Sequence, residues 1–372
     1  MRKYKPLIFI VLISYILLFT GCYSYKDINR VIFVTSLLID LDDNENIVIY
    51  ADTLKPYRDT SESSEKGQRS VYKGEGKSLL EAIDNMNLSS SFQLNFSQNK
   101  AVIFTQKAAE KGIDTYMDYL NRDQELNVRS YLFVYYGDIE KLMNIASNNE
   151  EYLGSFLNDI VNKVSSSPKA IFLNMNDYLT QKKLGSGITI ITALEVEKEK
   201  AEEKIHLVGG GVIREGKLVD KLEASQTQSY NLLTKGIKNG TIEVANPEDK
   251  EKLITLKIIK GKAKTELSLS GGKPQLIKKI KLRTIIGEAQ GSLTLSEDNI
   301  AAIKSSAQEV LRNRTESFFY EYKGKEIDIL NVEREIEIKY PQSINSISPY
   351  RAELWIYPEV IIEGSSNIKN TN

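Results

Sequence analysis

Apolar and polar residues alternate in several parts of the chain, which predicts strands. The run 31–41 is apolar and β-prone, an acidic, asparagine-rich bend follows it, and 47–50 is apolar again, so a β-hairpin is expected here. A compact hairpin is also expected at 205–220, around a Glu215-Gly216 turn. Further strands are expected at 100–104, 128–135, 188–196, 241–244, 253–259, 263–269, 276–286 and 352–362. Pro358 interrupts the last of these, which is therefore expected to be an edge strand or a broken one.

Apolar residues at helical spacing predict helices between these strands. Ser78 precedes a set of apolar positions, and Glu81 follows three residues later, which is the capping-box spacing of a helix start. The strongest helical pattern follows Ser296, where positions 300, 303, 307, 310 and 311 form one apolar stripe. The other helices are expected at 108–122, 138–145, 152–164, 175–182, 225–235 and 327–338.

This mixture of elements predicts an α+β fold of three domains, with mostly antiparallel sheets covered by helices. The charged run 195–204 indicates a first domain junction, or an exposed strand end that leads to one, and Asn246-Pro247 marks a second boundary. We therefore expect domains at 22–200, 201–247 and 248–372. The 351 residues that follow position 21 exceed what one hydrophobic core usually supports.

The first 21 residues have the pattern of a secretory signal peptide. Three basic residues among the first five precede an apolar run at 7–19, which is too short for a permanent membrane span. Small residues, Thr20-Gly21, then precede Cys22, as in bacterial lipoproteins, whose cysteine receives a diacylglycerol and becomes the mature N-terminus. Phe19 departs from the usual Leu, Ile or Val. We expect Cys22 to be lipidated and its acyl chains, palmitate among them, to hold the protein to a bilayer.

Composition and charge exclude some classes of function. The chain without its first 21 residues carries 46 basic and 50 acidic residues, which argues against nucleic acid as a partner. With Cys22 assigned to lipid, no cysteine is left for an intrachain disulfide. A histidine-dependent nucleophile would have to use His206, the one histidine, and a zinc site of His and Cys ligands lacks residues. We expect no catalytic residue, no metal and no cofactor.

Two glycine-containing segments match nucleotide-binding loops only in part. Gly74–Ser78 looks like the end of a phosphate-binding loop, but Val71 stands where the motif requires glycine, so a turn followed by a helix cap is the better interpretation. Gly209–Gly211 lies between apolar residues without a βαβ frame, and glycines there favour a bulge or a close approach of two backbones. His206, three residues before this run, is expected to be structural or exposed.

One acidic segment matches a calcium-binding loop in part. Asp40, Asp42 and Asn44 have the alternate spacing of calcium ligands in an EF-hand. That loop also requires a glycine and a bidentate glutamate, and Glu45 and Ala51 occupy these positions. A solvated hairpin bend is therefore the expected role.

A series of short motifs runs along nearly the whole mature chain. They are Gly21-Cys22 with Lys26-Asp27-Ile28, a Gly-x-Gly-x-Ser-x-x-Glu-Ala helix entry at 74–82, a strand and helix with an Arg-Asp pair at 99–129, a hairpin at 209–218, and the segment 318–341. In this order they resemble the Ger(x)C family, the C-subunit lipoproteins of bacterial spore germinant receptors. Two departures are Tyr23, where the family has Trp, and Asp328-Ile329-Leu330, where it has Asp-Ile-Phe-Gly.

The resemblance implies a function, a location and partners. It implies a non-enzymatic, three-domain lipoprotein on the outer face of the spore's inner membrane, held there through Cys22. It also implies two partners, a transporter-like B subunit in the membrane and a largely membrane-embedded A subunit, with which the chain takes part in nutrient-triggered germination.

Two other classes of function remain open from the residues alone. The first is a lipid-anchored hydrolase that uses a pair of carboxylates, because Asp and Glu are abundant and spacing excludes no pair. The second is a substrate-binding lipoprotein of an importer. Substrate-binding lipoproteins usually have two α/β lobes of alternating strands and helices, whereas this sequence is rich in adjacent antiparallel strands.

Overall fold

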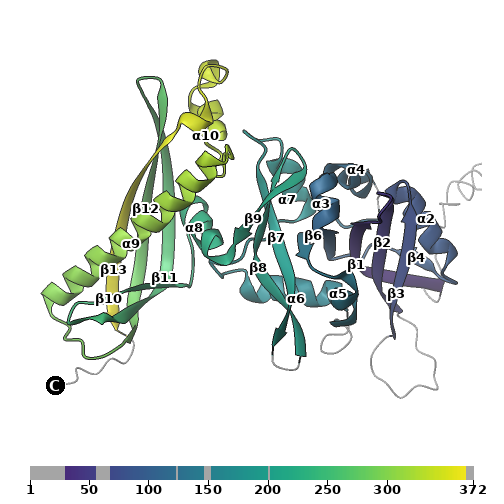
Figure 1. The fold of residues 1–372 in the computed structure, drawn as a ribbon, viewed down its shortest axis with the longest axis horizontal. Coiled ribbons are helices and arrows are strands. Elements are labelled where there is room, and N and C mark those ends of the chain that lie inside the picture. The colour runs from purple at the N-terminus through teal and green to yellow at the C-terminus, as the bar shows by residue number, and fades with distance from the viewer. Residues whose placement is uncertain (1–29, 56–67, 123–124, 146–151, 200–201, 366–372) are drawn as a thin grey trace, which may run out of the picture.

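The computed structural model describes residues 30–55, 68–122, 125–145, 152–199 and 202–365, and two sheets organise them (Figure 1). The first sheet has nine strands in the order β3-β2-β1-β5-β6-β7-β8-β9, with β4 paired to β1. The second has four strands in the order β10-β11-β12-β13. Helices lie against both sheets, so the α+β class expected from the sequence is confirmed.

The elements have the following bounds. The strands are β1 Val31–Leu41, β2 Ile47–Lys55, β3 Gln68–Gly76, β4 Gln93–Asn95, β5 Ala101–Thr105, β6 Tyr131–Tyr136, β7 Thr189–Glu199, β8 Glu202–Arg214, β9 Lys217–Glu223, β10 Thr241–Asn246, β11 Asp249–Ser270, β12 Lys273–Ala289 and β13 Glu353–Ser365. The helices are α2 Leu79–Leu88, α3 Gln106–Gly112, α4 Asp114–Arg122, α5 Ile139–Ile145, α6 Leu153–Val164, α7 Met175–Gln181, α8 Ala224–Thr234, α9 Glu297–Gly324 and α10 Val332–Lys339.

The first sheet is parallel at its centre and antiparallel at both ends. Strands β1, β5, β6 and β7 pair in parallel, while β2 and β3 on one side and β8 and β9 on the other pair antiparallel. Helices α2, α3, α4 and α7 cover one face, and α5 and α6 cover the other. All five residues of β5 are buried, as expected for a strand between two helical layers. The sequence pattern had not indicated the parallel pairs.

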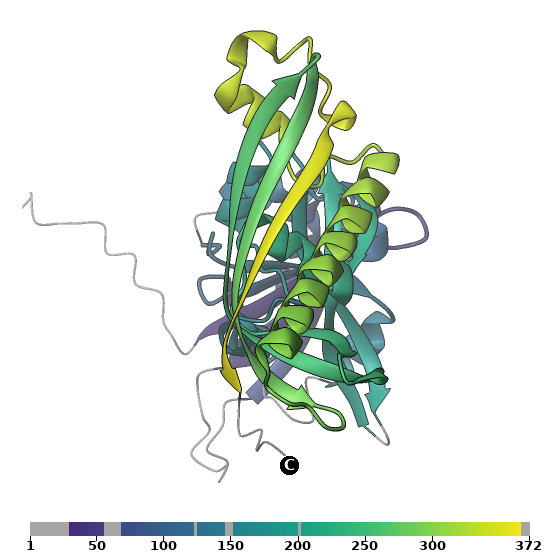
Figure 2. The same cartoon turned by 90° about the vertical axis from the view of Figure 1, so that its left-hand side faces the viewer.

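The second sheet is covered on one face by the long helix α9 (Figure 2). Strands β10, β11 and β12 pair antiparallel, and β13 adds to β12 in parallel. The two strands expected at 253–259 and 263–269 are one strand, β11, with a bulge between Ile258 and Lys260. Pro358 lies within β13, which forms the edge of the sheet and is not broken there.

Helix α8 joins the two sheets (Figure 1). Its buried Leu232 and Leu233 belong to a core that includes Val212 of the first sheet and Ile254 of the second. The strands of the expected middle domain, 201–247, are divided, because β8 and β9 belong to the first sheet and β10 to the second. The chain passes from one sheet to the other through α8, and the three-domain boundaries stay a prediction.

Polar contacts fix the same junction at a second place. Asn331 has a left-handed backbone, with φ of 52°, and its side-chain oxygen accepts the N–H of Ser186 at 3.3 Å. The N–H of Gly185 donates to the Glu337 carboxylate at 3.3 Å. A Cβ on Gly185 would lie 2.1 Å from the Asn331 side-chain oxygen, so the segment after α7 and the start of α10 are in close contact.

Three expectations about single elements were wrong. The helix expected at 108–122 is two helices, because Gly112 has a φ of 138° and the N–H of Ile113 donates to the Gly216 carbonyl at 2.7 Å. The helix expected at 327–338 begins at Val332, where the N–H groups of the first turn donate to Asp328. Strand β3 was not predicted.

The charged run 195–204 agrees with one of its two interpretations, an exposed strand end. In its described part this run forms the paired ends of β7 and β8.

A buried carboxylate links the first sheet to both helices on one of its faces. Asp52 of β2 is fully buried, and it forms an ion pair with Arg69 of β3 at 2.5 Å. Its other oxygen accepts the Thr35 hydroxyl and the N–H of Leu153, the first residue of α6, both at 2.8 Å. Arg69 also donates to the Met143 carbonyl in α5 at 3.0 Å. Asp52 therefore caps α6 from a neighbouring strand and is satisfied by three donors.

The second sheet buries a lysine. Lys278 of β12 is 3% exposed and faces α10, and its ammonium donates to the Thr265 hydroxyl at 2.7 Å. Burial lowers the pKa of Lys278 to about 8, although the charges of Glu335 and Asp328 act in the opposite direction. Burial also raises the pKa of Asp328 above its ordinary value, against the N–H groups of Glu333 and Val332 that donate to its carboxylate. The Lys278 ammonium therefore has fewer polar partners than the Asp52 carboxylate.

Candidate functional site

The expected lipidation site, Cys22, lies outside the described residues, so its role stays a prediction. Among the helices of the described part, none is long and apolar enough to span a bilayer.

The acidic bend between β1 and β2 holds the hairpin together. Asp42 accepts the N–H groups of Asn44 and Asn46 at 2.8 and 2.7 Å and the Asn46 side-chain amide at 2.9 Å. The hydrogen bond from the Asn46 side chain is the main reason why the pKa of Asp42 lies below its ordinary value. Asp40 accepts the Thr105 hydroxyl at 2.6 Å. Asp42 therefore closes the turn, as the hairpin interpretation predicted, whereas Asp40 links β1 to β5. The described residues contain no group of three potential metal ligands.

The segment Gly74–Ser78 is a close contact followed by a helix cap. A Cβ on Gly74 would lie 2.1 Å from the Ala82 carbonyl oxygen, so this glycine lets β3 pack directly against α2. The Ser78 hydroxyl accepts the N–H of Glu81 at 3.2 Å, and the Glu81 carboxylate accepts the N–H of Lys77 at 2.7 Å. The helix cap expected from the sequence is therefore confirmed, whereas the expected turn is limited to a bend at 77–78, because Gly74–Gly76 end strand β3.

The Gly209–Gly211 run allows β8 to fit between β7 and β9. Gly209 has a φ of 120°, and a Cβ there would lie 1.9 Å from the Leu222 carbonyl oxygen. The pairing of β7 and β8 shifts register at this point, which confirms the expected bulge and close approach. His206 lies in β8 opposite Glu195, in the strand position expected for it.

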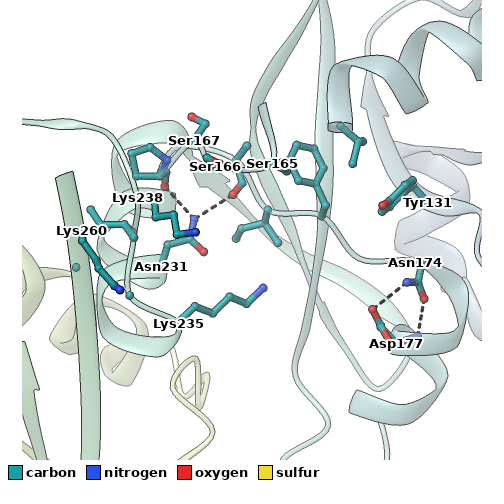
Figure 3. Close-up of a pocket in the computed structure, with 18 residues that line it drawn as sticks. Tyr131, Ser165, Ser166, Ser167, Asn174, Asp177, Asn231, Lys235, Lys238 and Lys260 are labelled. Atoms are coloured by element: carbon teal, nitrogen blue, oxygen red, sulfur yellow. Dashed lines mark hydrogen bonds between the residues drawn. The ribbon is translucent and has the colours of Figure 1, made fainter. Parts of the chain in front are cut away.

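A pocket of about 550 Å³ lies at the junction of the two sheets (Figure 3). The first sheet's side contributes the segment after α6 and the start of α7, and the second contributes the end of α8 and the bulge of β11. Figure 3 shows Lys235, Lys238 and Lys260 across the pocket from Tyr131 and Asp177. The lining residues are Tyr131, Val161, Ser165–Pro168, Ala170–Phe172, Asn174, Asp177, Asn231, Lys235–Lys238, Lys260 and Gly261.

Two glycines bring the lysines of this junction pocket together. Gly236 ends α8 with a φ of 72°, and a Cβ there would lie 2.6 Å from the Gly261 carbonyl oxygen. The N–H of Gly261 donates to the Ile237 carbonyl at 2.6 Å, which ties β11 to the segment after α8. Asn231 donates to the carbonyls of Pro168 and Ala170 at 2.9 and 3.0 Å and so fixes the opposite wall.

The junction pocket is cationic, with three lysines and one carboxylate among its lining residues. Within the described part of the chain, no carboxylate forms an ion pair with Lys235, Lys238 or Lys260. The surrounding protein lowers the pKa of Lys235, and the charge of Asp177 acts against this effect. Asp177 itself accepts the Asn174 side-chain amide at 2.9 Å. An anionic group is therefore the ligand that this pocket would favour.

A second hollow, of about 720 Å³, lies where three parallel strands of the first sheet end. Asp40 of β1, Thr105 of β5 and Tyr135 of β6 contribute to it, together with the start of α5. This is the edge where ligands bind in open parallel sheets. Asp40, Glu110, Asp138 and Glu140 line it against one lysine, Lys107, which donates to the Leu41 and Asp42 carbonyls. It would favour a cationic group.

The sequence interpretation missed both concavities. The strand-end hollow depends on the parallel order of β1, β5 and β6, which no local pattern reveals. The junction pocket depends on the segment between α6 and α7 lying opposite the end of α8 and the bulge of β11, which are far from it in the sequence. The sequence does contain one signal for the junction pocket, the two lysine–glycine pairs Lys235-Gly236 and Lys260-Gly261. In each pair a basic side chain stands next to a glycine, whose backbone can turn or approach another segment closely.

Two family models match the chain in succession. The model described as the spore germination protein N-terminal domain matches residues 24–196. The model described as spore germination B3/GerAC-like, C-terminal, matches residues 208–371. The gap between the matches, residues 197–207, includes the end of β7 and the first part of β8, before the chain leaves the first sheet.

Curated relatives agree with these matches over most of the chain. Spore germination protein B3 of Bacillus subtilis is 25% identical over 76% of this chain and 75% of its own length. Spore germination protein GerQC of Bacillus cereus is 24% identical over 64% of this chain and 65% of its own length. Spore germination protein KC of Bacillus subtilis is 20% identical over 91% and 88% of the two chains.

A solved structure has the same fold. The crystal structure of the GerBC protein matches with a TM-score of 0.58 and 18% identity, over 88% of this chain and 96% of that one. At this identity the likeness supports the fold alone. The family rests on the two models and the curated relatives, and they show that this chain belongs to the Ger(x)C family of spore germination proteins.

Proposed function

We propose that this chain is the C subunit of a spore germinant receptor and takes part in the response of the spore to nutrients. One observation carries the proposal: the N-terminal and C-terminal family models together match nearly the whole chain, from residue 24 to residue 371. The curated relatives are named as spore germination proteins, which supports the same conclusion.

The subunit acts by binding rather than by catalysis. The segments that partly resembled ligand-binding loops have structural roles, because Asp42 closes a turn and Gly74 allows a helix to approach a strand. The buried carboxylate Asp52 is engaged by Arg69 and the first turn of α6, which leaves it no reactive role. These observations favour a receptor component over a hydrolase that uses a carboxylate pair.

The subunit is anchored through Cys22 on the outer face of the spore's inner membrane and docks onto the A and B subunits. The signal-like pattern of the first 21 residues and the position of Cys22 support the anchor. The family membership supports the partners. Each of these statements has its own test.

Deletion of the gene tests the receptor role. We expect spores without this chain to lose or slow their response to one class of nutrient, measured as the fall in optical density of a spore suspension. Germination by a trigger that needs no nutrient should be unchanged. Normal responses to every nutrient, in a strain whose other germinant receptors have also been removed, would contradict the proposal.

Mass spectrometry of the N-terminal peptide tests the anchor. We expect a mature chain that begins at Cys22 and carries a diacylglycerol with further acyl groups. Cys22→Ala should lack the adduct and be released from the membrane fraction, whereas Ser24→Ala, two residues away, should keep both. A native chain that begins elsewhere, or an unmodified Cys22, would rule the anchor out.

Co-purification tests the partners. The full chain, tagged after residue 372 and extracted from spore membranes in mild detergent, should bring the A and B subunits with it in constant proportion. The tagged Cys22→Ala variant, produced at a matched level, separates docking from simple residence in the same membrane. If the wild-type chain is purified without the A and B subunits even after cross-linking in intact spores, docking to these subunits is excluded.

A further inference from the structure

One face of the second sheet has no cover in the described part of the chain. Helix α9 packs against the opposite face, where Leu276, Ile280 and Leu282 of β12 are buried. The residues between them point the other way, so that Lys279 and Lys281 are exposed. The same alternation continues in β13 and in β11, on either side of the β11 bulge.

This open face carries an excess of basic residues, and we name it the basic face. Its eight basic residues are opposed by six acidic ones, Glu243, Glu266, Glu288, Glu353, Glu359 and Glu363, for a net charge of +2. The whole chain has a net charge of −1, so the rest of the molecule carries −3. The basic residues are Lys257, Lys260, which also lines the junction pocket, Lys262, Lys264, Lys273, Lys279, Lys281 and Arg283.

Ion pairs neutralise three cations of β12 on the basic face but none of its β11 lysines. Lys279 pairs with Glu266 at 2.8 Å, and Lys281 pairs with Glu359 at 2.7 Å. Arg283 forms a two-point pair with Glu363. The four β11 lysines of the basic face, Lys257, Lys260, Lys262 and Lys264, have no carboxylate within 4.0 Å in the described ranges of the chain. They form an unneutralised line along one strand.

Aromatic side chains stand beside these cations. Trp355, the one tryptophan of the chain, is 48% exposed, and Tyr357 is 55% exposed on the same edge strand. In the sheet register they lie opposite Ile277 and Lys279. Ile259, 43% exposed at the β11 bulge, adds a further apolar side chain. Tryptophan and tyrosine among lysines are typical of surfaces that lie at a membrane–water interface.

We propose that the basic face lies against an anionic bilayer surface, with the β11 lysines over lipid phosphates and Trp355 and Tyr357 at the headgroup level. Charge complementarity selects this occupant, because an anionic leaflet attracts a cluster of basic side chains within about one Debye length. The contact is separate from the anchor proposed at Cys22 and stands without it. It would orient the second sheet on the membrane, which an anchor at the other end of the chain does not do.

The single tryptophan gives a direct measurement. The full chain, purified in detergent, is reconstituted with vesicles of phosphatidylglycerol and phosphatidylcholine or of phosphatidylcholine alone. In the anionic vesicles we expect a blue shift of Trp355 emission and quenching by lipids brominated near the headgroup. Both signals should disappear at about 1 M salt, where the Debye length falls to about 3 Å.

The same vesicles separate this proposal from the anchor. An anchored chain floats with both kinds of vesicle, whereas a chain held only by the basic face floats with the anionic vesicles alone. If the chain floats but Trp355 is quenched in neither kind, or equally in both, the basic face does not recognise anionic lipid and the proposal is overturned. Protection of Trp355 by an added A or B subunit, with no effect of anionic vesicles, would also overturn it.

Paired substitutions assign the effect to the β11 lysines. Each lysine near an anionic surface raises membrane partitioning about fivefold, so Lys262→Gln with Lys264→Gln should lower the salt-sensitive partitioning about 25-fold. The matched control, Lys77→Gln with Lys304→Gln, changes the net charge equally at exposed positions off the basic face and should leave partitioning within about twofold. Equal losses in both pairs would show a general charge effect and overturn the proposal.

Discussion

The two sheets of this molecule are covered differently, and the difference appears in every strand. The central strands of the first sheet lie between two helical layers and are buried on both faces, so β5 is a continuous apolar run. The second sheet has one helical layer, and β12 alternates buried and exposed residues along its length. A continuous run of apolar residues thus indicates a strand with both faces covered, and strict alternation of apolar and polar residues indicates a strand with one covered face.

The buried charges of the two sheets differ in the same way. Asp52, in the first sheet, accepts from Arg69, Thr35 and Leu153 and is fully engaged. Lys278, in the second, has one hydrogen bond, to Thr265, and a pKa that burial has lowered. A charge that organises its neighbours stabilises the fold, whereas a charge that is only partly satisfied weakens it. Substitutions at these residues can test this comparison.

The largest effect is expected in the first sheet. Asp52→Ala should lower the free energy of unfolding by about 3–5 kcal/mol, because it leaves the partly buried Arg69 without this carboxylate and removes the cap of α6. Urea denaturation followed by circular dichroism measures the change. The control is Glu266→Ala, which breaks an exposed pair with Lys279 in the second sheet and should cost less than about 1 kcal/mol. Similar losses in both variants would remove the distinction between the sheets.

A smaller effect of opposite sign is expected at Lys278. Lys278→Met should raise the free energy of unfolding at pH 7 by about 1–3 kcal/mol, because a side chain of similar shape replaces a poorly satisfied charge. Lys279→Met, one residue away and exposed, serves as the control and should change stability by less than about 0.5 kcal/mol. Destabilisation by Lys278→Met would mean that the ammonium is better satisfied than its contacts indicate.

The pH dependence of stability tests the same residue independently. The pKa of Lys278 is about 8 in the folded chain and 10.5 ordinarily, so the unfolded chain holds this proton more firmly between these values. The contribution of Lys278 therefore makes the folded state more stable as pH rises from about 8 to 10.5, and this gain is lost as pH falls through 8. The rise should be absent from Lys278→Met when urea denaturation is repeated at pH 7 and pH 9.5.

The smallest effect is expected at the junction between the sheets. Asn331→Ala should cost about 1–2 kcal/mol, because alanine is strained in the left-handed conformation and cannot hold Ser186. Asn331→Gly tolerates the conformation but loses the contact, so it should cost less than the alanine variant. Differential scanning calorimetry can rank the two. The reverse order would show that the backbone conformation is not what asparagine provides here.

Local patterns in the sequence predict the parts of this fold that depend on local interactions. The β1–β2 hairpin follows from two apolar runs around Asp42, and the start of α2 follows from Ser78 and Glu81. The helix after Ser296 follows from its apolar stripe, and its cap forms as expected, with Ser296 accepting the N–H of Asn299. In each case the residues that determine the structure lie within a few positions of one another.

The rest depends on residues that lie far apart in the chain. The parallel order of β1, β5, β6 and β7 is set by helices that cross between strands, and alternation within a strand carries no information about it. The Asp52 contact to Leu153 joins positions 101 residues apart. The basic face needs the register that places Lys279 beside Lys264, and the junction pocket needs both sheets. No pattern within a single segment could have given these sites.

Strand β13 has a consequence for how the protein is made. It pairs in parallel with β12, which ends at Ala289, yet β13 begins only at Glu353, after both α9 and α10. While the ribosome is still adding this interval, the nascent sheet has an open edge and an incomplete apolar layer, which invites aggregation. Folding of the second half therefore waits for synthesis of its closing strand, and a premature stop codon before position 353 would leave a truncated product prone to degradation.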